Sequence, residues 1–169
     1  MKVRVTDRKM HTYWKSPEYD IRGFLIVEKA SEKSERSEKM TAEDYMRIAI
    51  EEAKKGAGFT NPNPLVGAVL VKDGKVIGKD YHHRCGEFHA ERNAILNCKE
   101  DLHGAAIYVT LEPCQMCAGA IVQARIPRVV IGCMNPKAGC AGSILNLLDV
   151  KEFNHQVEKA LKKRKPRNN

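Results

Sequence analysis

The apolar and polar positions of the chain predict that ordered structure begins with a helix near residue 41. Thr41 followed by Asp44 resembles a capping box, in which two side chains satisfy free N–H groups at a helix start. Apolar residues then recur at helical spacing, at Tyr45, Ile48, Ala49 and Ala53. We expect this helix to end at Gly56 and Gly58.

Two apolar runs after this helix predict a β-hairpin. The runs cover Leu65–Val71 and Lys75–Gly78, and Lys72-Asp73-Gly74 separates them. An Asp-Gly pair between apolar runs favours a tight turn, because both turn positions adopt a positive φ. The two strands should therefore pair in antiparallel fashion.

The remainder of the core predicts a helix followed by a strand–helix–strand unit. A polar loop, Tyr81–Phe88, leads into a helix from about His89 to Cys98. A strand, a helix and a second strand follow, at Ala105–Thr110, Cys114–Ala124 and Arg128–Gly132. Because a helix connects these two strands, we expect them to run parallel. Together with the hairpin, this predicts an α/β fold, a three-layer α/β/α sandwich with a mixed central sheet.

The two ends of the chain differ from this core in composition. Residues 1–40 include a short apolar run that could pair as a strand, Ile21–Val27, and a segment rich in charge and serine, Glu28–Lys39. Such a composition is typical of a partly disordered extension with a charged linker. Residues 41–158 form the predicted domain, and residues 159–169 form a basic C-terminal tail. This tail either adds affinity for RNA or is simply a solvated charge run.

Composition narrows the class of protein. A chain of 169 residues suits one domain with a single core, and 43% hydrophobic residues exclude a disordered protein. The formal charge of +8 favours an anionic partner, either nucleic acid or a phosphorylated metabolite. The chain shows no apolar run long enough for a membrane and no signal-peptide core, so a cytoplasmic location is expected. In that reducing compartment, closely spaced cysteines indicate metal ligands rather than disulfides.

Two short motifs carry the predicted chemistry, His89-Ala90-Glu91 and Pro113-Cys114-Gln115-Met116-Cys117. One imidazole and two thiolates suit Zn2+, and three protein ligands leave the fourth tetrahedral position to water. The sequence therefore predicts one catalytic zinc per chain, held by His89, Cys114 and Cys117. The positive end of the second helix would favour the thiolate form of both cysteines.

Glu91 is the candidate catalytic residue. It follows His89 by two residues, so we expect it to reach a water molecule at the metal. Bound zinc lowers the pKa of water to about 7, and Glu91 would carry the proton to a ring nitrogen and then to the leaving amine. Ammonia would depart and leave a carbonyl group. The alternative interpretation is a structural zinc clip with an incidental glutamate.

Other polar residues leave alternatives open. Cys85 precedes His89 by four residues, but as a fourth ligand it would close the position reserved for water. Asn63, within the turn Asn61–Pro64, either shapes the substrate pocket or only forms the turn. His82 either contacts the substrate or lines a polar loop. Asn63 and His82 are therefore the candidate substrate-binding residues.

The pattern H-x-E followed by P-C-x-x-C is the signature of zinc-dependent nucleobase deaminases. Over about residues 41–158 the chain accordingly resembles the cytidine-deaminase-like superfamily. The segment Tyr45–Ala94 resembles the deaminase domain of the riboflavin-pathway RibD family, chiefly through Asn61–Gly67 and the run from Tyr81 to Glu91. In that family the residues matching Asn63 and His82 lie in the substrate pocket, which implies the same role here.

From about Tyr108 to Glu158 the chain resembles instead the bacterial tRNA adenosine deaminase family, TadA. The match includes Tyr108–Cys114, Cys117–Ala120, Asn135–Gly139 and Phe153–Glu158. Each half of the chain departs from the pattern of the family that the other half resembles. RibD-type domains place a longer spacer with a substrate-contacting lysine or arginine between the zinc cysteines, whereas only Gln115 and Met116 stand here. TadA usually has an Asn-Arg pair in the loop that holds His82 here.

The resemblance implies three competing functions. The first is deamination of adenosine to inosine in tRNA, and the second is deamination of a phosphoribosylated aminopyrimidine, a free base or a nucleotide. The third is a non-catalytic binding module stabilised by zinc, against which Glu91 argues because structure alone does not need that carboxylate. The implied partners are tRNA or a small pyrimidine metabolite, and a second copy of the chain in a homodimer. If His82 limits activity on tRNA, its replacement by Asn should raise that activity.

Overall fold

The computed structural model describes residues 39–161, and from Met40 onward these belong to one compact unit, Met40–Asn169. The expected N-terminal extension, with its possible strand at Ile21–Val27, lies outside the described residues apart from its last two positions. The tail beyond residue 161 also lies outside them. Within residues 39–161, no helix is both long and apolar enough to cross a membrane.

The first described helix, α3 (Ala42–Lys54), begins where the capping box predicted. The Thr41 side chain accepts the backbone N–H of Asp44 at 3.3 Å, and the Asp44 carboxylate accepts the N–H of Thr41 at 2.9 Å. The helix buries its apolar face against the sheet through Tyr45, Met46 and Ala49. The predicted helix is therefore confirmed.

Five strands form one mixed sheet with the order β2-β1-β3-β4-β5. The strands are β1 (Gly67–Lys72), β2 (Lys75–Tyr81), β3 (Ala106–Val109), β4 (Arg128–Ile131) and β5 (Glu158–Leu161). β1 pairs antiparallel with β2 and β3, whereas β3, β4 and β5 run parallel. The hairpin turn has positive φ at Asp73 and Gly74, 51° and 74°, as the Asp-Gly pair predicted.

The edge strand β5 differs from the sequence prediction. Residues 159–161 pair with β4, although the predicted basic tail began at residue 159. The segment Glu158-Lys159-Ala160-Leu161 is mostly exposed and has no run of apolar side chains, so no strand pattern marks it. Pairing with Arg128–Ile131, some thirty positions earlier, supplies its order.

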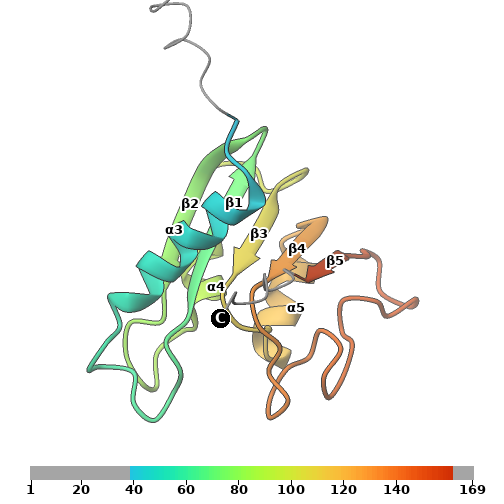
Figure 1. Ribbon diagram of the computed structural model, residues 1–169. Coiled ribbons are helices and arrows are strands. Elements are labelled where there is room, and N and C mark those ends of the chain that lie inside the picture. The colour runs from blue at the N-terminus through green and yellow to red at the C-terminus, as the bar shows by residue number, and fades with distance from the viewer. Residues whose placement is uncertain (1–38, 162–169) are drawn as a thin grey trace, which may run out of the picture. The chain divides into compact units, whose positions relative to one another are not determined.

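The sheet separates two apolar layers, because alternate strand residues face opposite sides. Val69 and Val71 of β1 pack against α3, while Ala68 and Leu70 face the other layer. That layer contains α4 (Ala90–Asn97) and α5 (Gln115–Gln123). In Figure 1, α3 lies across one face of the sheet and α4 and α5 lie against the other. The three-layer arrangement with a mixed sheet is thus confirmed.

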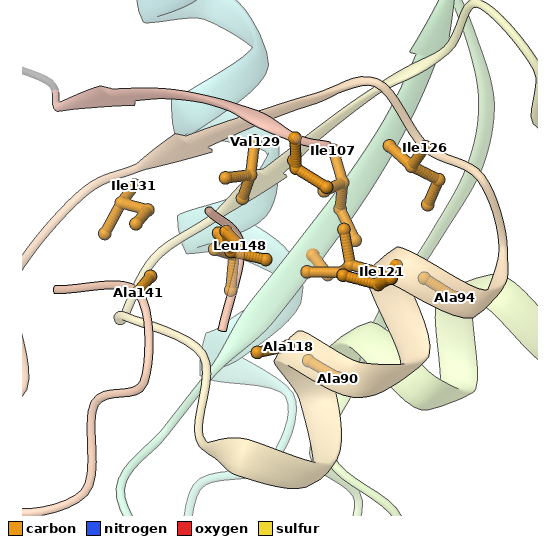
Figure 2. Packing of buried hydrophobic residues seen from close by; sticks show 14 of the residues in the cluster. Ala90, Ala94, Ile107, Ala118, Ile121, Ile126, Val129, Ile131, Ala141 and Leu148 are labelled. Carbon is orange, nitrogen blue, oxygen red and sulfur yellow. The ribbon is translucent and has the colours of Figure 1, made fainter. Parts of the chain in front are cut away.

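Small residues let the layers approach closely. A Cβ atom at Gly67 would lie 2.0 Å from the carbonyl oxygen of Ala49, so α3 can cross β1 at this distance only over a glycine. On the opposite face, Ala90 and Ala94 of α4 gather with Ala118 of α5 in the core (Figure 2). This close packing brings the N-terminal ends of α4 and α5 together.

Candidate active site

The candidate metal ligands stand at the first positions of two neighbouring helices. His89 is the N-cap of α4 and Cys114 is the N-cap of α5, while Cys117 lies in the first turn of α5. The sequence pattern predicted that this helix begins at Cys114, whereas it begins one residue later, at Gln115. His89 Nδ1 is 3.5 Å from Cys114 Sγ and 3.6 Å from Cys117 Sγ. Residues 25 and 28 positions apart in the chain therefore meet at one point.

This geometry fits a tetrahedral zinc site. With metal bonds of about 2.3 Å to sulfur and about 2.05 Å to nitrogen, tetrahedral angles place nitrogen and sulfur about 3.6 Å apart. The three ligand atoms lie within 4.8 Å of one another, and in residues 39–161 no other group of His, Cys, Asp or Glu side chains does so. Cys85 and Cys133 are exposed free thiols outside this group, and Cys140 is buried but also outside it.

The two thiols also need a cation if both are to ionise. A hydrogen bond from Cys117 is the main reason that the pKa of Cys114 falls to about 3. The same contact, together with burial, raises the pKa of the Cys117 thiol. A divalent metal held by both sulfurs would allow both to be thiolates.

Glu91 lies in the first turn of α4 and is 3% exposed. Burial raises the pKa of its carboxyl group to about 7. A group with a pKa near the working pH both accepts and returns a proton readily, as a general acid–base residue must. Glu91 lines the same pocket as His89 and Cys114.

The ligands and Glu91 open into a cavity of about 170 Å³. Its lining comes from two segments of the chain. The first wall consists of residues from 63–91, namely Asn63, Pro64, Val66, His82, His89 and Glu91. The second wall consists of residues from 111–143, namely Leu111, Glu112, Cys114, Asn135 and Ala138. The cavity is smaller than a typical drug-sized pocket of about 300–1,000 Å³, so it suits a single heterocyclic base.

In the first wall, Asn63 and His82 lie in the pocket lining but contact each other. His82 is 2% exposed, and its Nδ1 lies 3.0 Å from the carbonyl oxygen of Phe88. Because a carbonyl only accepts, Nδ1 carries the hydrogen, and Nε2 is left to accept from Asn63 Nδ2 at 3.1 Å. Both ring nitrogens of His82 are thus used within the protein, and the Asn63 carbonyl oxygen is the group left for a ligand.

The second wall contains two residues that sequence reasoning did not single out. Glu112 is 2% exposed and accepts hydrogen bonds from Asn135, Ala141 and Ser143. Burial alone raises the pKa of Glu112, but the hydrogen bond from Ser143 and those from the backbone lower it overall, so the group is a carboxylate. Asn135 itself lines the pocket. Their only sequence signals were the positions of Glu112 beside Pro113-Cys114 and of Asn135 before a proline.

The comparison with protein families matches residues 39–133 to the cytidine and deoxycytidylate deaminase zinc-binding region. The riboflavin biosynthesis protein RibD of Actinobacillus pleuropneumoniae is 50% identical over 115 residues, which cover 64% of this chain and 31% of RibD. The tRNA-specific adenosine deaminase of Bacillus subtilis is 47% identical over 123 residues, which cover 68% of this chain and 75% of that protein.

A solved structure of a tRNA:A34 deaminase, which performs A-to-I editing at the wobble position of transfer RNA, has a similar fold. Its TM-score is 0.61 with 34% sequence identity, and the match covers 70% of this chain and 96% of that one. This chain spans about a third of the length of the RibD relative, but most of the length of the tRNA deaminases. The relatives therefore divide between a small-metabolite class and a tRNA class.

Proposed function

Because the chain belongs to the cytidine and deoxycytidylate deaminase family, we propose that it converts adenosine to inosine in tRNA. The chain is a zinc-type hydrolytic deaminase, and the choice of substrate is the proposal. The observation that carries it is the pocket lining, which contains neither Lys nor Arg among the described residues. Beside the predicted metal ligands and two glutamates, the pocket thus offers a base apolar and amide side chains, but it offers a phosphate group no lysine or arginine.

A phosphoribosylated aminopyrimidine would need a cation close to the base. RibD-type domains take one from the longer spacer between the zinc cysteines, and Gln115 and Met116 leave no room for it here. Such a ligand would lack a charge-assisted hydrogen bond, which is the stronger kind. A tRNA spreads its anchoring over many phosphates, which a chain of net charge +8 can contact outside the pocket.

Pairs of cationic and aromatic side chains in residues 59–92, the stretch that includes the first wall, support this proposal. The guanidinium of Arg84 lies 5.9 Å from the ring of Phe59, and that of Arg92 lies 5.0 Å from the ring of Phe88. Phe59 is 58% exposed and Phe88 is 49% exposed. Exposed aromatic rings paired with arginines suit single-stranded nucleic acid, because bases stack on the rings while phosphates meet the charges.

The described residues divide the deamination chemistry among them. Zinc held by His89, Cys114 and Cys117 would supply an activated water molecule. Glu91 would take one proton from the attacking water and deliver it to the ring nitrogen. It would then take the second proton from the hydroxyl group left on the carbon and pass it to the amine, so that ammonia departs and a carbonyl remains. Asn63 and Asn135 would hold the edge of the base, since an amide can both donate and accept.

A second candidate function is the RibD-type deamination of an aminopyrimidine ribotide. The observation that favours it is the contact between Asn63 and His82, at the positions that the RibD resemblance assigns to the substrate pocket. A third, a zinc-stabilised binding module, does not explain a buried Glu91 with a raised pKa at the metal ligands. One zinc per chain, a homodimer and a cytoplasmic location remain predictions.

Parallel assays of the zinc-loaded chain test the substrate. We expect inosine to appear in unmodified tRNA, detected by nucleoside analysis, and no ammonia release from an aminopyrimidine ribotide. The Glu91→Gln chain is the control for contaminating deaminases in both assays. Ammonia release from the ribotide without inosine in tRNA would reverse the ranking of the two functions. No product from either substrate, with zinc bound, would favour the binding module.

A further inference from the structure

Glu112 is a buried carboxylate whose partners are all neutral. It lies between β3 and α5, two residues before Cys114. Its Oε1 accepts the backbone N–H groups of Ala141 at 3.0 Å and Ser143 at 2.9 Å. Its Oε2 accepts the N–H of Asn135 at 2.8 Å and the hydroxyl of Ser143. Among the ion pairs within residues 39–161, none involves Glu112.

These four donors saturate the carboxylate. An ionised carboxyl group offers about four acceptor sites and no donor. Burying it without a cation is unfavourable unless those sites are filled. All four donors come from residues 135–143, so the segment is ordered by wrapping around the charge. A neutral amide at position 112 would present N–H groups where the segment also presents N–H groups.

The wrapped segment supplies the outer part of the second wall. Asn135 and Ala138 line the pocket, and the Asn135 side-chain oxygen accepts the N–H groups of Lys137 and Ala138 at 3.2 and 3.3 Å. These bonds fix the orientation of the Asn135 amide, so its NH2 group is the one left to face a ligand. The backbone repeats the connection, because Cys140 N–H donates to the carbonyl oxygen of Pro113 at 2.7 Å.

Gly139 shows how closely the segment encloses the carboxylate. A Cβ atom at this position would lie 2.1 Å from Glu112 Oε2 and 2.6 Å from the carbonyl oxygen of Asn135. An alanine here would force the carboxylate and the segment apart by contact alone, without removing any hydrogen-bonding group. It therefore gives a second way to disturb the same interaction.

We propose that Glu112 is a positioning residue that fixes the segment 135–143 as the second wall of the pocket and so sets where Asn135 meets the base. The same short stretch, residues 112–114, carries both this anchor and a metal ligand. These three consecutive residues therefore fix how far the segment 135–143 lies from the metal ligands. The proposal rests on the proposed function only in requiring that the pocket binds a nucleobase.

The test compares four full-length, zinc-loaded variants: Glu112→Gln, Gly139→Ala, Ser143→Ala and, as the matched control, Glu51→Gln on the exposed face of α3. Three readouts are measured: zinc per chain, hydrogen–deuterium exchange, and kcat and KM on tRNA. In Glu112→Gln and Gly139→Ala we expect zinc to stay bound and exchange in residues 135–143 to rise about tenfold or more. We expect kcat/KM to fall about 10- to 100-fold, mainly through KM, because the wall is misplaced.

Ser143→Ala is a milder change, which still tests the interaction if the other two variants do not fold. It removes one donor of four, so exchange and KM should shift in the same direction by less. The control Glu51→Gln should leave all three readouts unchanged.

Two results would overturn the proposal. One is unchanged exchange in residues 135–143 when Glu112 becomes Gln. The other is loss of zinc in step with loss of protection, which would make Glu112 part of the metal scaffold instead. If the parent chain is silent on tRNA, the proposed function fails separately, and the KM comparison is made on the aminopyrimidine ribotide. There, a KM that Glu112→Gln leaves unchanged counts against the proposal, and a raised KM supports it.

Discussion

The first wall of the pocket is held by neutral hydrogen bonds, whereas the second wall is built around a charge. In the first wall, His82 links Asn63 to the backbone of Phe88 without any ionised group. In the second wall, the Glu112 carboxylate collects four donors from one segment. The sequence-based prediction places the first wall in the RibD-like part of the chain and the second in the TadA-like part.

The predicted metal ligands link these two differently held walls. His89 comes from the first wall, and Cys114 and Cys117 come from the second. Each wall also has hydrogen bonds of its own, between Asn63 and His82 in the first and to the Glu112 carboxylate in the second.

Breaking this link should have the largest effect. Cys114→Ala removes a metal ligand from the second wall, so zinc should be lost and with it turnover. If free zinc is a thousandfold above its Kd, the stabilisation that disappears is about 4 kcal/mol. Metal analysis and thermal unfolding with and without chelator measure both effects. The exposed Cys85→Ala is the control and should retain zinc; zinc retained by Cys114→Ala would disprove the assignment.

Replacing Glu91, the proposed proton carrier, should leave both walls and the metal site intact. In Glu91→Gln we expect zinc to stay bound while kcat falls by about 10²–10⁴-fold, because an amide cannot shuttle protons. Steady-state ammonia release, with metal content measured on the same sample, checks this. Glu87→Gln, an exposed glutamate in the preceding loop, should behave like the parent chain. Near-normal turnover in Glu91→Gln would show that another group moves the proton.

Changes in the first wall should be milder and confined to substrate binding. Asn63→Ala removes the free carbonyl oxygen and should lower kcat/KM about tenfold or more. His82→Asn should also lower it, because the shorter side chain cannot span the carbonyl of Phe88 and the amide of Asn63. The geometry thus reverses the gain expected from sequence. The exposed Asn61→Ala is the matched control, and faster tRNA deamination by His82→Asn would restore the sequence-based view.

Lowering the pH should reduce the stability of the fold through Glu52, whose ion pairs include one between α3 and β2. Glu52 on α3 contacts Lys55 at 2.6 Å and Lys79 on β2 at 2.9 Å. Burial raises the pKa of Glu52, but the bonds from Lys55 and Lys79 lower it overall. A lowered folded-state pKa means stability that is present above the usual value near 4.5 and is lost as pH falls through the lower one.

The expected contribution is about 1–2 kcal/mol, since both lysines are half-exposed. Denaturant unfolding of the parent chain and Glu52→Gln at pH 7 and pH 3.5 measures it. The difference between the two chains should be present at pH 7 and smaller at pH 3.5. An equal difference at both values would show that the ion pairs do not contribute.

Removing residues 162–169 should have the smallest effect, because the described pocket lining and the predicted metal ligands all belong to residues 63–138. We expect tRNA affinity to fall without any change in the base that is deaminated. The slope of log affinity against log salt should decrease by roughly 0.7–0.9 for each phosphate group that the shortened chain no longer binds. An unchanged slope would mean that the tail is only a solvated charge run.

Much of the fold and the metal site follows from local sequence alone. The capping box at Thr41, the Asp-Gly turn and the parallel pairing of the strands around α5 depend on neighbouring residues and on chain connectivity. The ligand types in His89-Ala90-Glu91 and in the two-cysteine motif indicate zinc before any coordinates are known, because few metals combine this donor set with an open position.

Which residues come together in the pocket walls depends on the tertiary structure alone. Glu112 meets its donors 23 to 31 residues further along the chain, and His82 meets Asn63 across 19 residues. The edge strand β5 likewise gains its order from pairing with β4 and not from its own pattern. A hydrogen bond between distant residues depends on the path of the whole chain, which local periodicity does not encode. The sequence therefore determined the reaction type, while packing determined which groups face the substrate.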